Sequence, residues 1–169
     1  MMIISIVSLI LSLLIQGIIS NFVGYTFMNL SFFYTVYVLI CLGVILPYFD
    51  DKKKYFILLV IFGLIIDIAY TNTFILNVFI FIVVYFFNKM FYSILPYNLF
   101  TINISSVISI IIYHIISFLM LLMLGYDSYT ISMLGISILH SIIMTIIYAS
   151  GLYLIISFIY KKFELKEVR

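Results

Sequence analysis

The first 49 residues of the chain carry no charged side chain, and the 62 residues from 99 to 160 carry only one, Asp127. Over its 169 residues the chain is 67% hydrophobic and 8% charged, whereas soluble domains carry about 25% charged residues. Uncharged apolar runs of this length can cross the hydrocarbon core of a bilayer as helices. We therefore expect an all-α integral membrane protein with almost nothing outside the bilayer.

Six apolar runs divide the chain, and short polar or charged segments separate them. Because one membrane-spanning helix needs about 20 residues, the length accommodates six spans and no soluble domain. We predict a single transmembrane domain, residues 1–160, and a short basic tail, residues 161–169. The first run lacks a basic leader and a cleavage site, so we interpret it as a retained span. The predicted spans are residues 3–19, 30–48, 55–70, 74–87, 99–124 and 131–160.

The basic residues indicate the orientation of the chain in the membrane. All eight fall in the second loop, the fourth loop or the tail, and a chain with six spans places these segments on one side. The first, third and fifth loops contain no Lys or Arg. Since an excess of Lys and Arg marks cytoplasmic loops, both termini are predicted to be cytoplasmic. The eight are Lys52, Lys53, Lys54, Lys89, Lys161, Lys162, Lys166 and Arg169.

Polar residues form a stripe along the first span. Ser5, Ser8, Ser12 and Gln16 follow one another at spacings that place them on one helical face. Such a stripe usually marks a contact between helices in lipid. The alternative is that each serine hydroxyl bonds back to a carbonyl of the preceding turn. We favour the helix contact.

Asp67 is the only charged residue between Lys54 and Lys89. A charge buried in hydrocarbon costs roughly 2.5–3.5 kcal/mol on insertion scales, so this carboxylate needs a partner. Gly63 lies one turn earlier on the same face, where a small residue lets another helix approach. We favour a structural role, in which Asp67 bonds a neighbouring helix or caps the next one with Asn77 as its partner. Cation binding and proton relay remain the alternatives.

His114 and His140 are the second pair of candidates. In adjacent antiparallel spans both lie about 15 Å below the outer surface and could face each other. A metal site would need a third ligand, and the sequence places no other histidine or carboxylate at that depth. A proton relay would need an aqueous path. We favour two separately hydrogen-bonded histidines, and we predict no metal site.

The remaining sequence features argue against several functional classes. Cys41 is the only cysteine, which excludes a disulfide within the chain and a thiolate cluster. The chain has no His-Glu-x-x-His helix, no Gly-x-Ser-x-Gly elbow, no paired membrane aspartates and no phosphate loop. The cations are dispersed along the chain, so we predict no nucleic-acid partner. We also expect no enzymatic activity and no cofactor.

The central hairpin carries a resemblance to a known family. It reads Gly63-Leu64-Ile65-Ile66-Asp67-Ile68, a short turn, then Leu76-Asn77 and an apolar run ending in Tyr85. This resembles the rod shape-determining protein MreD family, in which a Gly-Leu-Leu-x-Asp stretch precedes a turn, a Gly-Leu-Asn-like segment and another span. Length, six apolar runs and a basic tail match as well. Two positions differ. Met28-Asn29 stands where the family often has Pro-Asp, and Ile75 stands where it has a glycine after the turn.

The resemblance implies a non-enzymatic scaffold in the bacterial cytoplasmic membrane, and a bacterial source also suits the heavy use of Ile, Phe, Tyr, Asn and Lys. Proteins of this family work with the bitopic protein MreC. Their machinery links cytoplasmic MreB filaments to the peptidoglycan synthases, RodA and a class B penicillin-binding protein. The family is similar in fold to the substrate-binding S components of energy-coupling-factor vitamin transporters. The residues leave open whether the protein forms a homodimer.

The alternative function is that of an S component itself. Ser8-x-x-x-Ser12 in the first span resembles the small-x-x-x-small pair by which S components dock on their transporter. An S component also needs an outward-facing cavity with loops that close over it, and the predicted outer loops are short. We therefore favour the scaffold.

Overall fold

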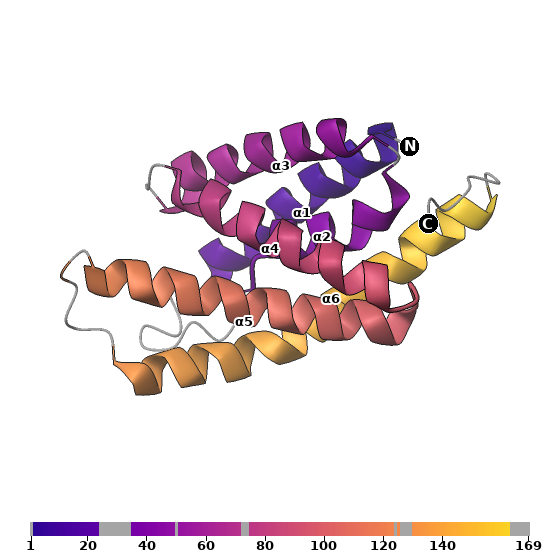
Figure 1. The fold of residues 1–169 in the computed structure, drawn as a ribbon. Coiled ribbons are helices and arrows are strands. Elements are labelled where there is room, and N and C mark those ends of the chain that lie inside the picture. The colour runs from indigo at the N-terminus through magenta and orange to yellow at the C-terminus, as the bar shows by residue number, and fades with distance from the viewer. Residues whose placement is uncertain are drawn as a thin grey trace.

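The computed structural model describes residues 2–23, 35–49, 51–71, 75–123, 125 and 130–162. All regular elements in these ranges are helical, which confirms the all-α prediction (Figure 1). In chain order they are α1 (Met2–Val23), α2 (Tyr37–Ile45), the 3-10 helix η1 (Leu46–Tyr48), α3 (Lys52–Ile66), the π-helix η2 (Asp67–Thr71), α4 (Leu76–Ile94), α5 (Leu99–Met123) and α6 (Ile131–Lys162).

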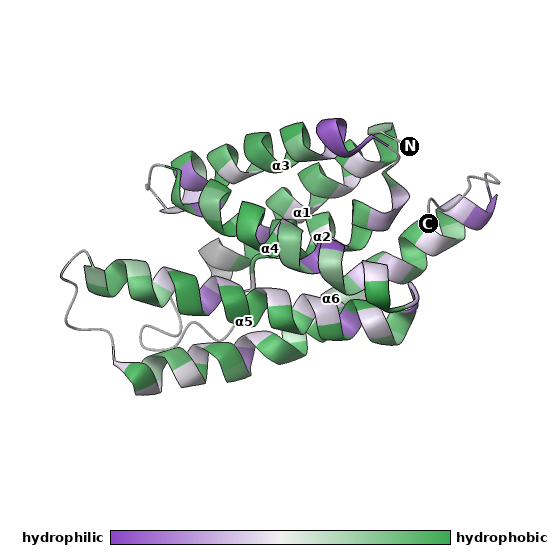
Figure 2. Ribbon diagram, in the orientation of Figure 1, coloured by the Kyte–Doolittle hydropathy of each residue, from purple (hydrophilic) through white to green (hydrophobic). Residues whose placement is uncertain are grey.

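Five helical segments in the described part of the chain are long and apolar enough to cross a membrane. They correspond to α1, α3 with η2, α4, α5 and α6. Their surfaces carry large apolar side chains, as lipid-facing helices require, and green dominates these helices in Figure 2. The protein is therefore a multi-pass membrane protein with five to six candidate spans.

The second predicted span differs from the other five. Its described part, Tyr37–Tyr48, is too short to be counted among the spanning helices, because 12 helical residues extend only about 18 Å. Every residue of α2 is buried, and α2 contacts α1, α4, α5 and α6. The centre of the bundle is therefore α2 rather than the α3–α4 hairpin. Residues 30–34, the outer part of the predicted span, lie outside the described residues.

The ends of the helices agree with one prediction about topology. Figure 1 shows that α1 begins, α3 begins and α6 ends at the same end of the bundle. The lysines of α3 and α6 make that end hydrophilic in Figure 2. The basic residues described at these termini therefore gather on one side, as the six-span topology requires. Assignment of that side to the cytoplasm stays a prediction, and residues 163–169 of the tail lie outside the described part.

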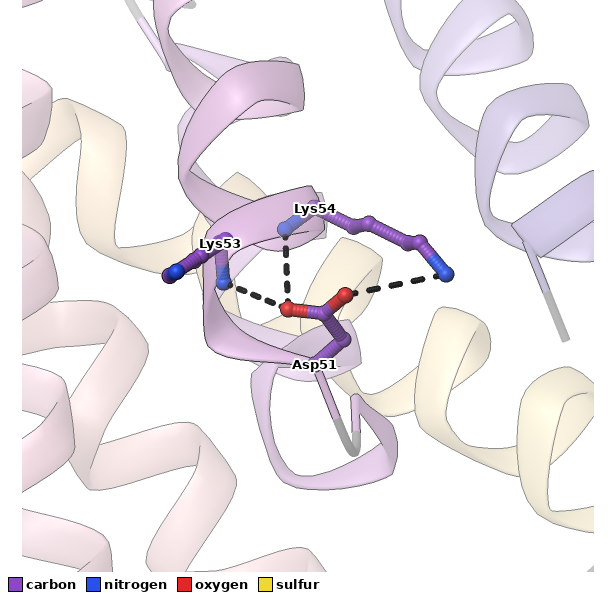
Figure 3. A network of polar contacts seen from close by, with 3 residues as sticks. All are labelled: Asp51, Lys53 and Lys54. Carbon is purple, nitrogen blue, oxygen red and sulfur yellow. Dashed lines mark hydrogen bonds and ion pairs between the residues drawn. The ribbon is translucent and has the colours of Figure 1, made fainter.

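Asp51 is the N-cap of α3, which begins at Lys52, three residues before the predicted start of the span. Its side chain accepts hydrogen bonds from the backbone N–H groups of Lys53, at 2.9 Å, and Lys54, at 3.4 Å (Figure 3). The Lys54 ammonium also lies 3.6 Å from the second carboxylate oxygen. The Asp51 carboxylate thus provides an acceptor for two N–H groups that have no partner within the helix. The N–H of Lys53 is the main cause that lowers the pKa of the Asp51 carboxyl below its ordinary value of 3.8.

This N-cap gives a prediction about pH. A carboxyl whose pKa is lowered on folding stabilises the folded state above its ordinary pKa, and this contribution is lost as the pH falls through the lowered value. We expect the amide hydrogens of Lys53 and Lys54 to lose protection against exchange as the pH falls below about 3.8. Hydrogen exchange measured against Asp51→Ala tests this. If wild type and Asp51→Ala differ in amide protection by the same amount at neutral and acidic pH, the cap does not depend on ionisation of Asp51.

Tyrosines near the basic end pack into the bundle. Tyr48, Tyr55 and Tyr160 are buried. The Tyr55 hydroxyl donates to the Leu42 carbonyl at 3.0 Å, and the Tyr97 hydroxyl donates to the Val44 carbonyl at 2.7 Å. Pro47, in η1, has no N–H to offer the carbonyls of the preceding turn. Tyrosines from neighbouring segments add donors at the end of α2, where the Leu42 carbonyl also accepts from the Leu46 N–H.

The fourth helix is longer than predicted. It runs to Ile94 rather than to residue 87, and it ends where Leu95 becomes extended before Pro96. The residue before a proline is disfavoured in the helical region, which explains the stop. Asn88, placed by the sequence in a connecting segment, is therefore a buried residue within α4.

Candidate functional site

Helices α3 and α4 approach closely at Gly63. A Cβ added to Gly63 would lie 3.0 Å from both the Cα and the Cγ2 of Val78, and 3.2 Å from its backbone nitrogen. These distances are tighter than nine in ten real Cβ contacts, so the glycine lets the two backbones come near without displacing Val78. The predicted role of Gly63 as a point of helix approach is confirmed.

The carboxyl group of Asp67 caps α4 from the end of the preceding helix. One oxygen accepts from the backbone N–H of Asn77 at 3.0 Å and from its side-chain amide at 2.9 Å. The other accepts from the backbone N–H of Val78 at 3.4 Å. Asp67 is 1% exposed and Asn77 is fully buried. The expected pairing of Asp67 with Asn77, and the expected capping of the next helix, are both confirmed.

Two further side chains join this cluster. The side-chain amide of Asn77 also donates to the Thr71 hydroxyl at 3.0 Å, at the end of η2. The hydroxyl of Tyr113, on α5, donates to the side-chain oxygen of Asn77 at 2.9 Å. We call Asp67, Thr71, Asn77 and Tyr113 the hairpin cluster. It joins η2, at the end of α3, to α4 and α5 through hydrogen bonds, and no signal in the sequence indicates that Tyr113 belongs to it.

Ile75, just before α4, has an unusual backbone conformation. Its φ of 65° and ψ of 0° place it in the left-handed region, and it is the only non-glycine residue with positive φ in the described part of the chain. A β-branched residue is strongly disfavoured there, whereas glycine adopts this conformation without strain. Residues 72–74 of the turn lie outside the described residues. At this position the MreD-like pattern has a glycine.

This conformation predicts a stabilising substitution. Ile75→Gly removes the steric conflict of the left-handed region, about 1–2 kcal/mol, and loses part of that gain to the greater freedom of glycine in the unfolded chain. We expect a net gain of about 1 kcal/mol in the free energy of unfolding in detergent. The matched control is Leu76→Gly, one residue into the helix, which should destabilise the protein. A loss of stability for Ile75→Gly would show that the left-handed conformation of Ile75 does not cost the folded state free energy.

A second buried polar cluster joins α4 to α5. The side-chain oxygen of Asn88 accepts from the hydroxyls of Ser105, at 2.6 Å, and Ser109, at 3.2 Å. Gly43 of α2 faces the amide nitrogen of Asn88, which would lie 3.2 Å from an added Cβ. Ser105 and Ser109 are both buried against neighbouring helices.

The serine stripe of α1 faces the bundle. Ser5 and Ser12 are buried, and Ser8 is half-buried. The Ser12 hydroxyl bonds back to the Ser8 carbonyl at 2.6 Å and shares a 2.6 Å hydrogen bond with the Tyr148 hydroxyl of α6. Both interpretations of the stripe are therefore correct for Ser12. It contacts another helix, and it also bonds to its own preceding turn.

The two histidines lie on neighbouring helices. His114 is buried on α5, with its ring 5.8 Å from that of Tyr113, and His140 is half-buried on α6. Helices α5 and α6 pack along each other, so the two histidines belong to adjacent elements as expected. The separate hydrogen bonding of the two histidines stays a prediction. Within the described ranges, His, Cys, Asp and Glu side chains form no group of three that could hold a metal ion.

No protein-family model, no curated protein and no solved structure matches the chain. The fold and the two polar clusters define its class directly. It is a helical multi-pass membrane protein in which buried polar side chains fasten one helix to the next.

Proposed function

We propose that the chain is a non-enzymatic membrane scaffold of the bacterial cell-elongation machinery, resembling MreD. In this role it binds an MreC-like bitopic partner in the cytoplasmic membrane, alongside RodA and a class B penicillin-binding protein, with MreB filaments as an indirect partner. The observation that carries the proposal is the left-handed conformation of Ile75. The residue that departs from the family pattern keeps the backbone geometry for which the family's glycine is suited.

The conformation of the hairpin supports the same proposal. The three residues that carry the resemblance most specifically, Gly63, Asp67 and Asn77, meet in one contact between α3 and α4. Each fulfils a task that requires its residue type: a close backbone approach, an acceptor for N–H groups, and a buried amide that bonds in several directions. The three residues of the motif thus build the hairpin itself.

The burial of Asp67 favours a scaffold over a carrier. A group that binds a cation or relays protons needs access to its ligand, whereas Asp67 is 1% exposed and accepts three hydrogen bonds from α4. The Asp67 carboxyl group thus holds two of the protein's own helices together. Recognition of partners is left to the apolar outer surfaces of the helices, where packing between helices drives association in lipid.

The burial of Ser12 argues against the alternative function. An S component would present its small-residue pair on the outer face of the first helix in order to dock on a transporter subunit. Ser12 is fully buried and bonded to Tyr148 of α6. The outer face of α1 carries large apolar residues instead: Ile3, Val7, Ile10, Leu11, Leu14 and Ile18.

Affinity purification from mild detergent tests the proposed function. The tagged protein is expected to recover an MreC-like protein and a class B penicillin-binding protein, quantified by mass spectrometry against an untagged strain. Tagged Ile75→Gly serves as a matched variant, because it leaves the outer faces of the membrane-spanning helices unchanged and should recover the same partners. Recovery of a transporter membrane subunit with paired ATPases, or of a bound vitamin, would overturn the scaffold in favour of an S component.

A further inference from the structure

Helices α1, α2 and α6 meet around the side chain of Tyr148. Its hydroxyl shares a 2.6 Å hydrogen bond with Ser12 of α1, and its ring stands edge-on to that of Tyr37 of α2, with 4.8 Å between centroids. Two residues before Tyr37, the Thr35 hydroxyl donates to the carbonyl of Ser141 on α6 at 3.2 Å. The beginning of α2 and the middle of α1 therefore both lie against α6 between Ser141 and Tyr148.

Within the described part of the chain, three polar atoms in this region are buried without a hydrogen-bond partner. They are the hydroxyls of Tyr37 and Thr145 and the side-chain oxygen of Gln16. Tyr37 is 3% exposed and Thr145 is 0% exposed. Thr145 lies one turn before Tyr148 on the same side of α6, and Gln16 lies one turn after Ser12 on α1. The three atoms thus come from three helices that converge on one residue.

Such atoms are costly to leave unpaired inside a membrane protein, because the surrounding lipid cannot supply hydrogen bonds. Their chemistry specifies what would satisfy them. Two hydroxyls can each donate and accept, and one amide oxygen accepts, which matches the two to four hydrogen bonds of a buried water molecule. None of the three groups is charged, so a bound ion would lose its hydration without a compensating charge. A neutral ligand is therefore favoured over an ion.

We propose that water binds between α1, α2 and α6 and bridges Tyr37, Thr145 and Gln16. This site has a structural consequence for α1, whose principal packing partner is α2. Bridging water adds a polar connection between α1 and α6 next to the Ser12–Tyr148 hydrogen bond. The water site would therefore help to fix the first helix against the rest of the bundle.

Thermal unfolding of Tyr37→Phe, Thr145→Val and the double variant in detergent tests the water site. Each single variant removes a group that holds the water, so each should lower the Tm by about 2–4 °C. The double variant should fall no further than the larger single effect, because both groups hold the same water. If the single variants raise the Tm or leave it unchanged, the hydroxyls were dry and unpaired. Additive losses would also overturn the proposal.

A matched control and a second measurement keep the test decisive. Tyr153→Phe makes the same change on α6 at a half-buried ring that packs 5.5 Å from Tyr97, and it should not couple with Thr145→Val. Radiolytic hydroxyl-radical footprinting of the unaltered protein generates radicals directly from bound water. It is expected to oxidise Tyr37 or Tyr148 despite their distance from bulk solvent. Absence of label at both residues would contradict the site even if a variant failed to fold.

Discussion

Asp67→Ala is expected to lower the free energy of unfolding by about 2–4 kcal/mol. The substitution removes the acceptor of the backbone N–H groups of Asn77 and Val78, which sit at the first turn of α4. Buried donors left without an acceptor cost about 1–3 kcal/mol each. The side-chain amide of Asn77 is affected less, because it also donates to Thr71.

Chemical or thermal unfolding of the purified protein in detergent measures this loss. Asp67→Asn is the matched variant, since its amide oxygen can still accept one of the hydrogen bonds and should recover part of the stability. A double-mutant cycle with Asn77→Ala isolates the contact, and the two losses should be far from additive. Wild-type stability in Asp67→Ala would mean that the carboxyl group does not hold α4.

Gly63→Ala is expected to destabilise the protein by about 1–3 kcal/mol, although alanine is the better helix former. The added methyl would stand 3.0 Å from the Cα of Val78 and 3.2 Å from its nitrogen. Backbone atoms cannot rotate out of the way as a flexible side chain can. The two helices must therefore separate at the very level where Asp67 caps α4.

Gly151→Ala is the matched control for this substitution. Gly151 also lies inside a helix, but an added Cβ there has no atom within 4 Å. The control should raise stability by up to about 1 kcal/mol through helix propensity alone. Opposite signs for the two glycines in the same unfolding assay support the close approach of α3 and α4. Equal effects would show that Gly63 acts only through its own helix.

The local part of this structure could be predicted from the sequence. Long uncharged runs require helices in lipid, and a lone aspartate inside one of them requires a partner nearby. Asp67 and Asn77 are ten residues apart across a short turn, so an antiparallel hairpin brings them together with little ambiguity. The role of Gly63 in the helix contact could be predicted because it lies one turn before Asp67 on the same helical face. The cap of α3 by Asp51 extends a helix that apolarity alone would have started at Tyr55.

The contacts between distant helices could not be predicted in the same way. In a membrane protein both the lipid-facing and the core-facing positions are apolar, so hydrophobic periodicity does not identify the buried face. Nothing local distinguishes Tyr113 or Asn88 from other polar residues in apolar helices, yet each bonds a side chain on another helix. The short length and full burial of α2 depend on the helices around it. A tyrosine inside the bundle also cannot be distinguished by sequence from one at the membrane interface.

The most direct test of the proposed scaffold is a measurement of cell shape during depletion of the protein, combined with fluorescent labelling of new peptidoglycan. Loss of a scaffold of the elongation machinery should make rod-shaped cells wider and then round, and new wall material should lose its localisation along the side wall. Expression of wild-type protein or of Ile75→Gly should restore both. Rods that keep their width and labelling pattern during depletion, while uptake of a vitamin falls, would contradict the scaffold.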